Sequence, residues 1–381
     1  MKQEKEEIQD LNLRVKSDNN INNRKEQPQE KNSYPENTNE IQSRLTDRDE
    51  HDIKKAFSKL GVEDWVYSEE RVRRILVMPV GFPNAGKSLF LSSLMYYATK
   101  GKERKNQYDN EEEGYDNSFS VKVESRYPYD SGRDAYDKMR EDFGRGKLYD
   151  VTQTGTMDLI GITMKPNRTG IPPLRLAFLD LAGEDIKKIK HNLGSTFTDK
   201  INALFEGIKI PKSPVVFILI TPYEPRQEEI VDFDGKKRKE SLQEAHDRED
   251  ALHFDFLNYL ETNLQWVLNN ARIFVIVSQW DKNDEADKYE NDDDKRKKAV
   301  EEFIREKRPS IYNFVKDNPN VIWGNYSVGN VIVSQRKGIT IQELDNPRFD
   351  YPSRFWKSLY KVCTGKDLVK VPFLEKLFKI F

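Results

Sequence analysis

Residues 75–88 read ILVMPVGFPNAGKS, and this stretch decides the fold. An apolar run, Ile75 to Val80, leads into the pattern G-x-x-x-x-G-K-S from Gly81 to Ser88, and a helix-length segment follows. This is the Walker A phosphate-binding pattern in the strand, loop and helix context that it requires. Its glycines let the backbone wrap so that successive N–H groups face phosphate oxygens, and the start of the helix adds a positive dipole end. The stretch therefore predicts a P-loop fold that binds a nucleotide.

Individual roles follow from the chemistry of the loop residues. Lys87 is predicted to neutralise the β- and γ-phosphates and is counted as catalytic. The hydroxyl of Ser88 is predicted to coordinate Mg²⁺, which keeps an octahedral shell of phosphate oxygens and waters. The other predicted nucleotide contacts of this loop are Gly81, Asn84, Ala85, Gly86 and Leu89.

A second apolar run ends in an acidic motif. Residues 174–181 read LRLAFLDL, so Asp180 lies at the carboxyl edge of a predicted strand, where it can hold Mg²⁺ through water. Gly183 completes the pattern D-x-x-G, and its N–H can reach the γ-phosphate. Glu184 follows directly and is the candidate for orienting or deprotonating the attacking water, with Asp185 as the fallback. A surface glutamate without a role is the alternative for Glu184.

A threonine-rich loop, TQTGT at 152–156, lies between these two motifs. Thr154 is expected to close over Mg²⁺ and the γ-phosphate, as a metal ligand and a catalytic residue, and Thr156 is the second choice. The polar insertion before this loop carries Arg133 and Arg145, either of which is a candidate to contact the transferred phosphate.

A further apolar run, 273–277, leads into SQWD at 278–281. Asp281 is suited to accept hydrogen bonds from guanine N1–H and N2–H₂, a pair of donors that adenine lacks. Guanine-specific proteins have N-K-x-D or T-K-x-D here, so Ser278 and Gln279 depart from the pattern, although Gln279 is kept as a predicted base contact. A helix N-cap is the alternative role for this aspartate. The remaining predicted base contacts, through backbone N–H groups of YSVG, are Ser327 and Val328.

Apolar runs bounded by turn residues recur along the chain and predict buried strands. Helix-length segments such as 89–98 and 251–269 lie between them, and this alternation favours a three-layer α/β fold with a mostly parallel sheet. The polar stretches at about 100–150, 223–250 and 283–297 are predicted to be surface insertions. The predicted strands are Ile75–Val80, Leu159–Met164, Leu174–Leu181, Val215–Ile220, Ile273–Val277 and Val321–Trp323.

The two ends of the chain differ from its middle. Residues 1–50 are rich in Gln, Asn, Glu and Lys without a sustained apolar period, and they are predicted to be a disordered tail. Residues 51–381 are predicted to form the folded domain. Its C-terminal segment is expected to dock on that domain, with a membrane surface or a partner as alternatives. The apolar stripe of this segment comprises Phe373, Leu374, Leu377, Phe378 and Phe381.

Composition excludes several classes of protein. Among 381 residues, 63 Lys and Arg balance 65 Asp and Glu, so nucleic acid is not an expected partner. The mean hydropathy is −0.83, and no window approaches the roughly 18 apolar residues of a membrane span. A single cysteine excludes an internal disulfide framework and fits the cytoplasm. The histidines are scattered without metal-ligand spacing, so no structural metal is expected.

The motifs GFPNAGKS, TQTGT, DLAGE and SQWD, in this order over about residues 70–335, resemble P-loop GTPases of the TRAFAC, or Ras-like, class. The long first insertion, LRLAFLDLAGED and the closing FWKSLYKVCTGKDL resemble the bacterial double-GTPase proteins. The resemblance implies a cytoplasmic switch that binds GTP or GDP with Mg²⁺, hydrolyses GTP slowly and acts with protein partners. A second GTPase is one such partner, and some relatives belong to predicted conflict or defence systems. An ATPase with the same phosphate site and a noncatalytic nucleotide-binding scaffold stay open as alternatives.

Overall fold

The computed structural model describes residues 74–103, 118–125, 130–148, 157–188, 205, 215–232, 234–285, 292–336, 339–345 and 347–368. The predicted tail 1–50, the boundary at residue 51, Thr154 with its loop, and the C-terminal stripe 373–381 lie outside these residues.

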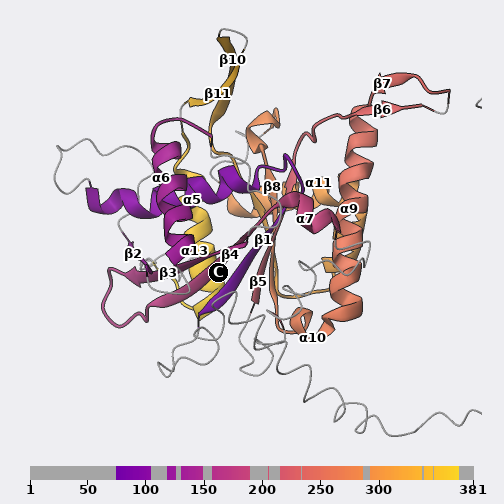
Figure 1. The fold of residues 1–381 in the computed structure, drawn as a ribbon. Coiled ribbons are helices and arrows are strands. Elements are labelled where there is room, and N and C mark those ends of the chain that lie inside the picture. The colour runs from indigo at the N-terminus through magenta and orange to yellow at the C-terminus, as the bar shows by residue number, and fades with distance from the viewer. Residues whose placement is uncertain are drawn as a thin grey trace, which may run out of the picture. The chain divides into compact units, whose positions relative to one another are not determined.

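A seven-stranded sheet in the order β2-β3-β4-β1-β5-β8-β9 forms the centre of the fold (Figure 1). The strands from β4 to β9 pair in parallel, whereas β3 pairs antiparallel with both β4 and β2. All six predicted strands lie in this sheet. β2 was not predicted, because its sequence FSVKV lies in a polar insertion and alternates as an edge strand does. The bounds are β1 Ile75–Val80, β2 Phe119–Val123, β3 Met157–Pro166, β4 Leu174–Leu181, β5 Val215–Pro222, β8 Arg272–Ser278 and β9 Val321–Asn325.

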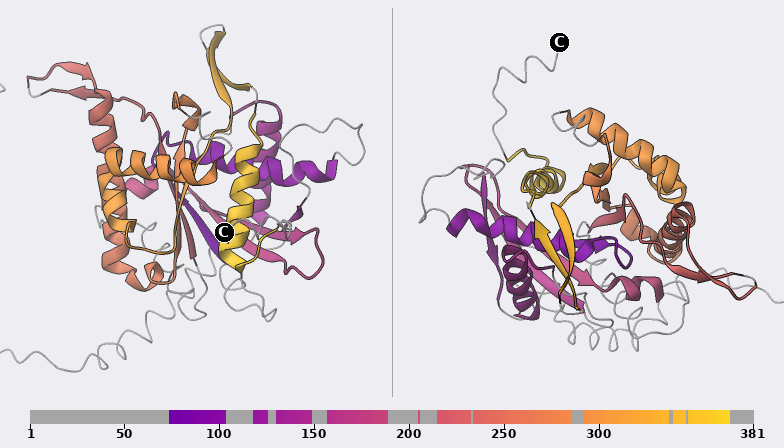
Figure 2. Two further views of the ribbon diagram at one scale, coloured as in Figure 1. Left: turned by 180° about the vertical axis from the view of Figure 1, so that it is seen from behind. Right: turned by 90° about the horizontal axis from the view of Figure 1, so that it is seen from above.

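Helices cover both faces of the sheet, so the prediction of a three-layer α/β fold is confirmed (Figure 2). Successive residues of β1 point to opposite faces: Leu76 and Met78 contribute to one buried core and Val77 to the other. This two-sided burial is why the central strands read as continuous apolar runs. One face carries α5 Lys87–Glu103, α6 Asp130–Gly144 and α13 Asp350–Thr364, and the other carries α7 Gly183–Lys188, α9 Leu242–Asn263, α10 Gln265–Leu268, α11 Asp293–Lys307 and α12 Pro309–Val315.

Helix α13 is fixed on the sheet by aromatic residues. The indole Nε1 of Trp356 donates to the carbonyl of Leu94 on α5 at 3.2 Å. The ring of Phe355 lies 5.1 Å from that of Phe90 and 5.2 Å from that of Phe274. The chain after β9 therefore returns to the face on which α5, the helix that follows the phosphate loop, is packed.

The predicted helix 251–269 is wrong at both ends. Helix α9 begins at Leu242, where Ser241 and Glu244 form a reciprocal capping box, and it ends at Asn263. A separate turn of helix, α10, follows Leu264. The start was missed because residues 242–250 are strongly polar, although Glu249 and Asp250 among them are buried.

Two hairpins extend from the edge where the parallel strands end (Figure 1). β6 Glu229–Val231 pairs with β7 Lys237–Lys239, and β10 Asn330–Arg336 pairs with β11 Ile339–Asp345. The predicted surface insertion 223–250 thus contains a hairpin and the start of α9. The insertion 100–150 likewise contains β2 and α6, which packs on α5 and β3.

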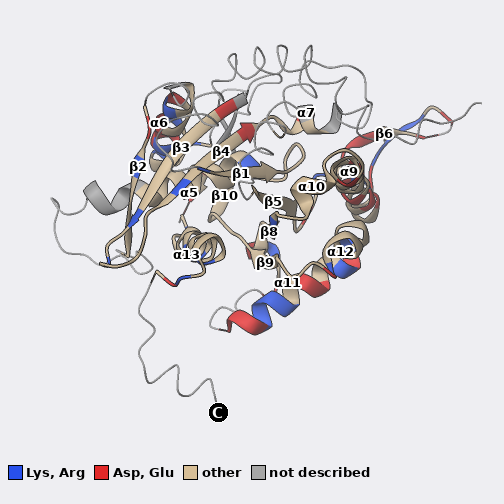
Figure 3. Ribbon diagram, turned by 90° about the horizontal axis from the view of Figure 1, so that it is seen from below, with Lys and Arg blue, Asp and Glu red and all other residues tan. Residues whose placement is uncertain are grey.

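The described surface mixes charges of both signs. Groups of acidic and basic residues alternate along α11, and ion pairs such as Lys297–Asp294 lie on it (Figure 3). None of the helices in the described part of the chain combines the length and apolar character needed to cross a membrane.

Candidate functional site

The predicted site residues gather at the carboxyl edge of the sheet. The phosphate loop joins β1 to α5, the D-x-x-G motif follows β4, SQWD follows β8, and YSVG follows β9. Ligands of open parallel α/β sheets bind at this edge. The topology alone therefore brings together motifs that are separated by up to about 240 residues of sequence.

The phosphate loop is wound tightly by two residues in the left-handed conformation, Asn84 at φ 70° and Gly86 at φ 85°. Asparagine and glycine are the residues that adopt this conformation at least cost. Ala85 N–H donates to the Phe82 carbonyl at 3.0 Å, and Phe90 N–H donates to the Gly86 carbonyl at 2.8 Å as α5 begins. Such a succession of right- and left-handed residues forms a concave nest of N–H groups that suits an anion.

Lys87 and Asp180 form a buried ion pair beneath this loop. The Lys87 ammonium donates to Asp180 Oδ1, and the two side chains are only 6% and 1% exposed. A buried carboxylate needs a counter-charge, because its desolvation is costly. The lysine predicted to bind phosphates therefore neutralises the aspartate predicted to hold Mg²⁺. Ser88, another predicted metal ligand, is adjacent to Lys87 at the first turn of α5 and is half-buried.

Asp158 is an acidic residue of this region that the sequence analysis missed. It lies on β3 directly opposite Asp180 on β4, so the two side chains project from the same face of the sheet. Burial raises the pKa of Asp158, the Ser131 hydroxyl opposes this by hydrogen bonding, and the charges of Asp180 and Asp134 raise it further. The only sequence signal for Asp158 was that a single carboxylate directly precedes the apolar run 159–164.

Gly183 brings the D-x-x-G motif against the phosphate loop. A Cβ added to it would lie 2.8 Å from the backbone nitrogen of Pro83 and 3.0 Å from the carbonyl oxygen of Gly81. Only a residue without a side chain allows this approach. Glu184, the second residue of α7, is exposed.

A second set of contacts joins SQWD to the phosphate loop. Ser278 Oγ donates to the Ala85 carbonyl at 2.7 Å, although Ser278 is one of the two departures from the guanine-specific pattern. Gln279 has the left-handed φ of 57°, and its amide oxygen is buried without a partner among the described residues. Trp280 is buried and packs on Tyr223, with ring centroids 5.8 Å apart, so it belongs to the core.

Asp281 is held by the YSVG loop. The hydroxyl of Ser327 donates to Asp281 Oδ1 at 2.6 Å, and Trp280 N–H donates to the Tyr326 carbonyl at 3.1 Å. Asp281 lies within a single 3₁₀ turn, Trp280–Lys282, rather than at a helix N-cap. Val328 is fixed from the other side, because its carbonyl accepts from Arg348 N–H at 3.0 Å.

Helix α9 supports the first turn of the phosphate loop through His253, which the sequence did not indicate. The imidazole is fully buried, lies edge-on 4.7 Å from the ring of Phe82, and contacts the Glu249 carbonyl through Nδ1 at 2.7 Å. Burial lowers the pKa of His253 to about 4. The ring is therefore neutral and acts as packing under the loop.

A buried arginine fixes the end of β5 to α9. Arg308 donates to Thr221 Oγ1 at 2.7 Å, to His246 Nδ1 at 2.6 Å and to the Pro222 carbonyl at 3.3 Å. Burial lowers the pKa of Arg308 to about 10, and burial together with the Arg308 charge lowers the pKa of His246 to about 4. His246 therefore accepts this hydrogen bond as a neutral ring.

The two arginines that the sequence proposed as phosphate contacts are paired with carboxylates of α6. Arg133 Nε pairs with Asp137 at 2.6 Å, and Arg145 pairs with Glu141 at 3.5 Å. Both pairs have i,i+4 spacing, Arg145 being the residue directly after α6, and both are partly or fully exposed. Neither arginine is brought to the phosphate loop by a contact of the described residues.

Comparisons with known proteins add little to this geometry. No protein-family model matches the chain, and no curated protein matches it. Among solved structures, a chain of the signal recognition particle receptor SRb-GTP/SRX complex from Chaetomium thermophilum is similar, with a TM-score of 0.35 and 8% identity. The match covers 76% of this chain and 99% of that chain. At this level of similarity the fold assignment rests on the sheet and its helices, not on the match.

Proposed function

We propose that this protein is a Mg²⁺-dependent switch that binds GTP, hydrolyses it slowly and changes its affinity for a protein partner. The observation that carries the proposal is the connection of three loops at one edge of the sheet. Ser278 ties SQWD to the phosphate loop, and Ser327 ties YSVG to Asp281. A phosphate cradle and an aspartate suited to guanine are thus parts of one hydrogen-bonded unit.

Guanine is the base that this unit fits best. A carboxylate has two oxygens and about four acceptor positions, so Asp281 can keep the Ser327 hydroxyl and still accept from two donors of a base. Guanine offers N1–H and N2–H₂ side by side, whereas adenine offers no such pair. The backbone N–H groups of Ser327 and Val328 are the proposed donors to the guanine carbonyl, and Gln279 is the proposed contact to the face of the base.

The phosphate side of the site requires Lys87 to change partner. A bound triphosphate offers Lys87 several anionic oxygens in place of Asp180, and Asp180 is then free to face a metal ion. Hydroxyl and carboxylate oxygens are the donors that Mg²⁺ prefers, so Ser88 and Asp180 fit this ion, and Thr154 is the proposed third residue. When bound, Mg²⁺ neutralises charge on the β- and γ-phosphate oxygens.

Hydrolysis and switching are proposed to share the D-x-x-G segment. Gly183 touches the phosphate loop and can offer its N–H to the γ-phosphate, while Glu184 is the proposed residue that aligns water. Loss of the γ-phosphate removes these contacts, so the segment is released and the affinity for a partner changes. A second GTPase is the kind of partner that the family resemblance suggests.

The test is a change of base preference. Isothermal titration of nucleotide-stripped protein should show binding of GTP and GDP in Mg²⁺ and no binding of ATP. Asp281→Asn replaces one acceptor oxygen by an N–H₂ donor, so it should weaken GTP binding and favour xanthosine triphosphate, which has a carbonyl where guanine has N2–H₂. Asp284→Asn, at an exposed aspartate three residues later, is the matched control and should bind as the parent does.

Two results would contradict the proposal. Binding of ATP alone by the parent protein would favour an ATPase. Tight binding of GTP without release of phosphate, even over many hours, would favour a noncatalytic scaffold.

A further inference from the structure

We propose that Arg226 contacts the γ-phosphate of the bound nucleotide and stabilises its transfer to water. The inference rests on the proposed function and adds a catalytic residue to it. Arg226 lies between β5 and the β6–β7 hairpin, in a stretch whose composition predicted only a surface insertion.

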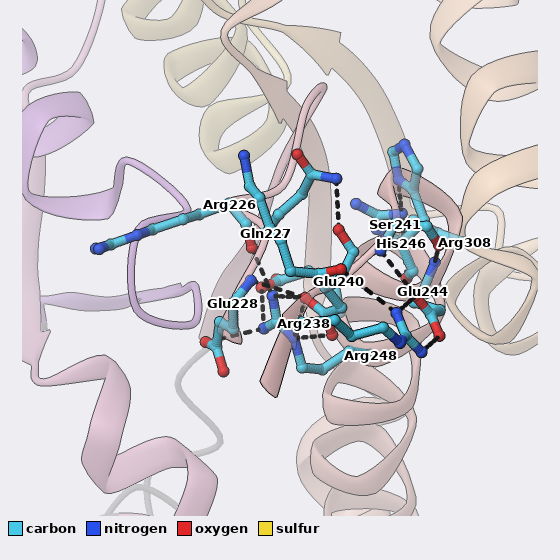
Figure 4. A network of polar contacts seen from close by, with 12 residues as sticks. Arg226, Gln227, Glu228, Arg238, Glu240, Ser241, Glu244, His246, Arg248 and Arg308 are labelled. Atoms are coloured by element: carbon cyan, nitrogen blue, oxygen red, sulfur yellow. Dashed lines mark hydrogen bonds and ion pairs between the residues drawn. The ribbon is translucent and has the colours of Figure 1, made fainter. Parts of the chain in front are cut away.

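The backbone around Arg226 is held firmly. Arg248 Nη2 on α9 donates to the Arg226 carbonyl at 2.7 Å. Gln227 Nε2 donates to the Glu240 carbonyl at 2.6 Å, and Glu228 N–H donates to Glu240 Oε2 at 3.0 Å. Three successive residues, 226–228, are therefore hydrogen-bonded to α9 or to Glu240, which lies just before α9 (Figure 4).

The side chain of Arg226 takes no part in this network. In Figure 4 it points away from α9, whereas its neighbours bind carboxylates: Arg238 pairs with Asp232 and Glu244, and Arg248 pairs with Glu240. Among the described residues, the Arg226 guanidinium has no hydrogen bond or ion pair, and the residue is exposed. The positive charge of Arg226 is therefore available to bind an anion that is not part of this network. The backbone that carries it is already held by hydrogen bonds.

Contacts on two sides place this backbone near the phosphate loop. On one side, Tyr223 N–H donates to the Ser278 carbonyl at 2.9 Å, and Ser278 is bonded to Ala85 of the loop. Arg226 is three residues beyond Tyr223, a span of at most about 10 Å.

On the other side, Arg248 holds the Arg226 carbonyl and lies five residues before His253 on α9. Five helical residues rise about 7.5 Å. Since His253 packs on Phe82 of the phosphate loop, the helix also brings Arg226 to this edge.

The chemistry requires such a group. In hydrolysis the water oxygen forms a bond to the γ-phosphorus, the bond from the γ-phosphorus to the bridging oxygen breaks, and the proton of water ends on the released phosphate. Negative charge spreads over the γ-phosphate oxygens and the bridging oxygen in the transition state. A guanidinium binds two such oxygens through parallel N–H bonds and stays protonated throughout.

The test compares hydrolysis with binding. Arg226→Ala should slow single-turnover GTP hydrolysis at saturating GTP by at least about 100-fold, while the Kd for GTP changes by less than about threefold. Arg226→Lys should recover only part of the rate, because lysine lacks the planar fork. Arg238→Ala, which removes an arginine of the same network that is ion-paired instead, is the matched control and should hydrolyse GTP at the parent rate.

A second measurement uses GDP with aluminium fluoride, which imitates the phosphoryl group in transfer. The parent protein should trap GDP in this complex, and Arg226→Ala should not. Hydrolysis and trapping unchanged by Arg226→Ala would overturn the role of Arg226 and leave the proposed function intact. Binding without any hydrolysis by the parent would remove the role as well, and absence of GTP binding by the parent would overturn the proposed function itself.

Discussion

Replacement of Lys87 by methionine should destabilise the nucleotide-free protein strongly, and a second replacement at Asp180 should restore part of the loss. Both side chains are almost fully buried and pair with each other. Lys87→Met leaves the Asp180 carboxylate buried without this counter-charge, which costs about 3–5 kcal/mol. Lys87→Met combined with Asp180→Asn removes both charges and keeps the shapes, so we expect it to regain about 2–4 kcal/mol of this loss.

The assay is equilibrium urea unfolding of four proteins: the parent, the two single variants and the double variant. All are stripped of nucleotide and kept in EDTA, and the double-mutant cycle gives the coupling energy of the pair. GTP titration of the same proteins separates stability from binding. Both proteins that carry Lys87→Met should bind GTP poorly, whether or not their stability is restored.

Two outcomes would refute this reasoning. A loss of less than about 1 kcal/mol in Lys87→Met would mean that the carboxylate does not depend on this lysine. Losses of the two single variants that simply add up in the double variant would mean that the two charges are not coupled. In either case the exchange of Lys87 between Asp180 and the phosphates would not describe the site.

Three further predictions concern the loops around the site. Gly183→Ala should weaken GTP binding and slow GTP hydrolysis, because its Cβ would lie 2.8 Å from the backbone of the phosphate loop and one of the two segments must shift; an unchanged Kd and an unchanged single-turnover rate would contradict this. Ser278→Ala should raise the Kd for GTP about three- to tenfold by removing the 2.7 Å bond to Ala85, whereas Ser278→Thr, which keeps the hydroxyl, should change it less; titration calorimetry measures both. Burial lowers the pKa of His253 from 6.5 to about 4, so its neutral form stabilises the fold above pH 6.5 and this contribution is lost as pH falls toward 4. Relative to His253→Phe, the parent should lose about 3 kcal/mol of unfolding free energy over that range in urea titrations, and curves that run parallel would disprove the assignment.

The sequence predicted the parts of the fold whose residues carry a local pattern. The central strands are buried on both faces, so they appear as continuous apolar runs, and the loop at Gly81 to Ser88 has a spacing that its backbone geometry requires. The start of α9 has a local capping box at Ser241 and Glu244, but residues 242–250 are so polar that no apolar period begins there. The hairpin of β6 and β7 is mostly exposed, so it shows no apolar pattern either. Asp158 and His253 contact residues that are distant in the sequence, Asp180 and Phe82 respectively. A pattern of residue spacing cannot reveal such contacts.

SQWD shows why a departure from a motif need not remove the function of each position. The motif has two separate tasks, because it must be attached to the phosphate loop and must also offer an acceptor to the base. Ser278 performs the first task, because its hydroxyl donates to the Ala85 carbonyl at 2.7 Å. A side chain longer than serine is not needed to reach this carbonyl. The second task depends on Asp281, whose carboxylate is oriented by Ser327 from a different strand end. A comparison of the motif with its consensus sequence does not distinguish the two tasks, whereas the hydrogen bonds assign them to different residues. The proposal of guanine binding therefore depends on Asp281 and can be tested at that residue alone.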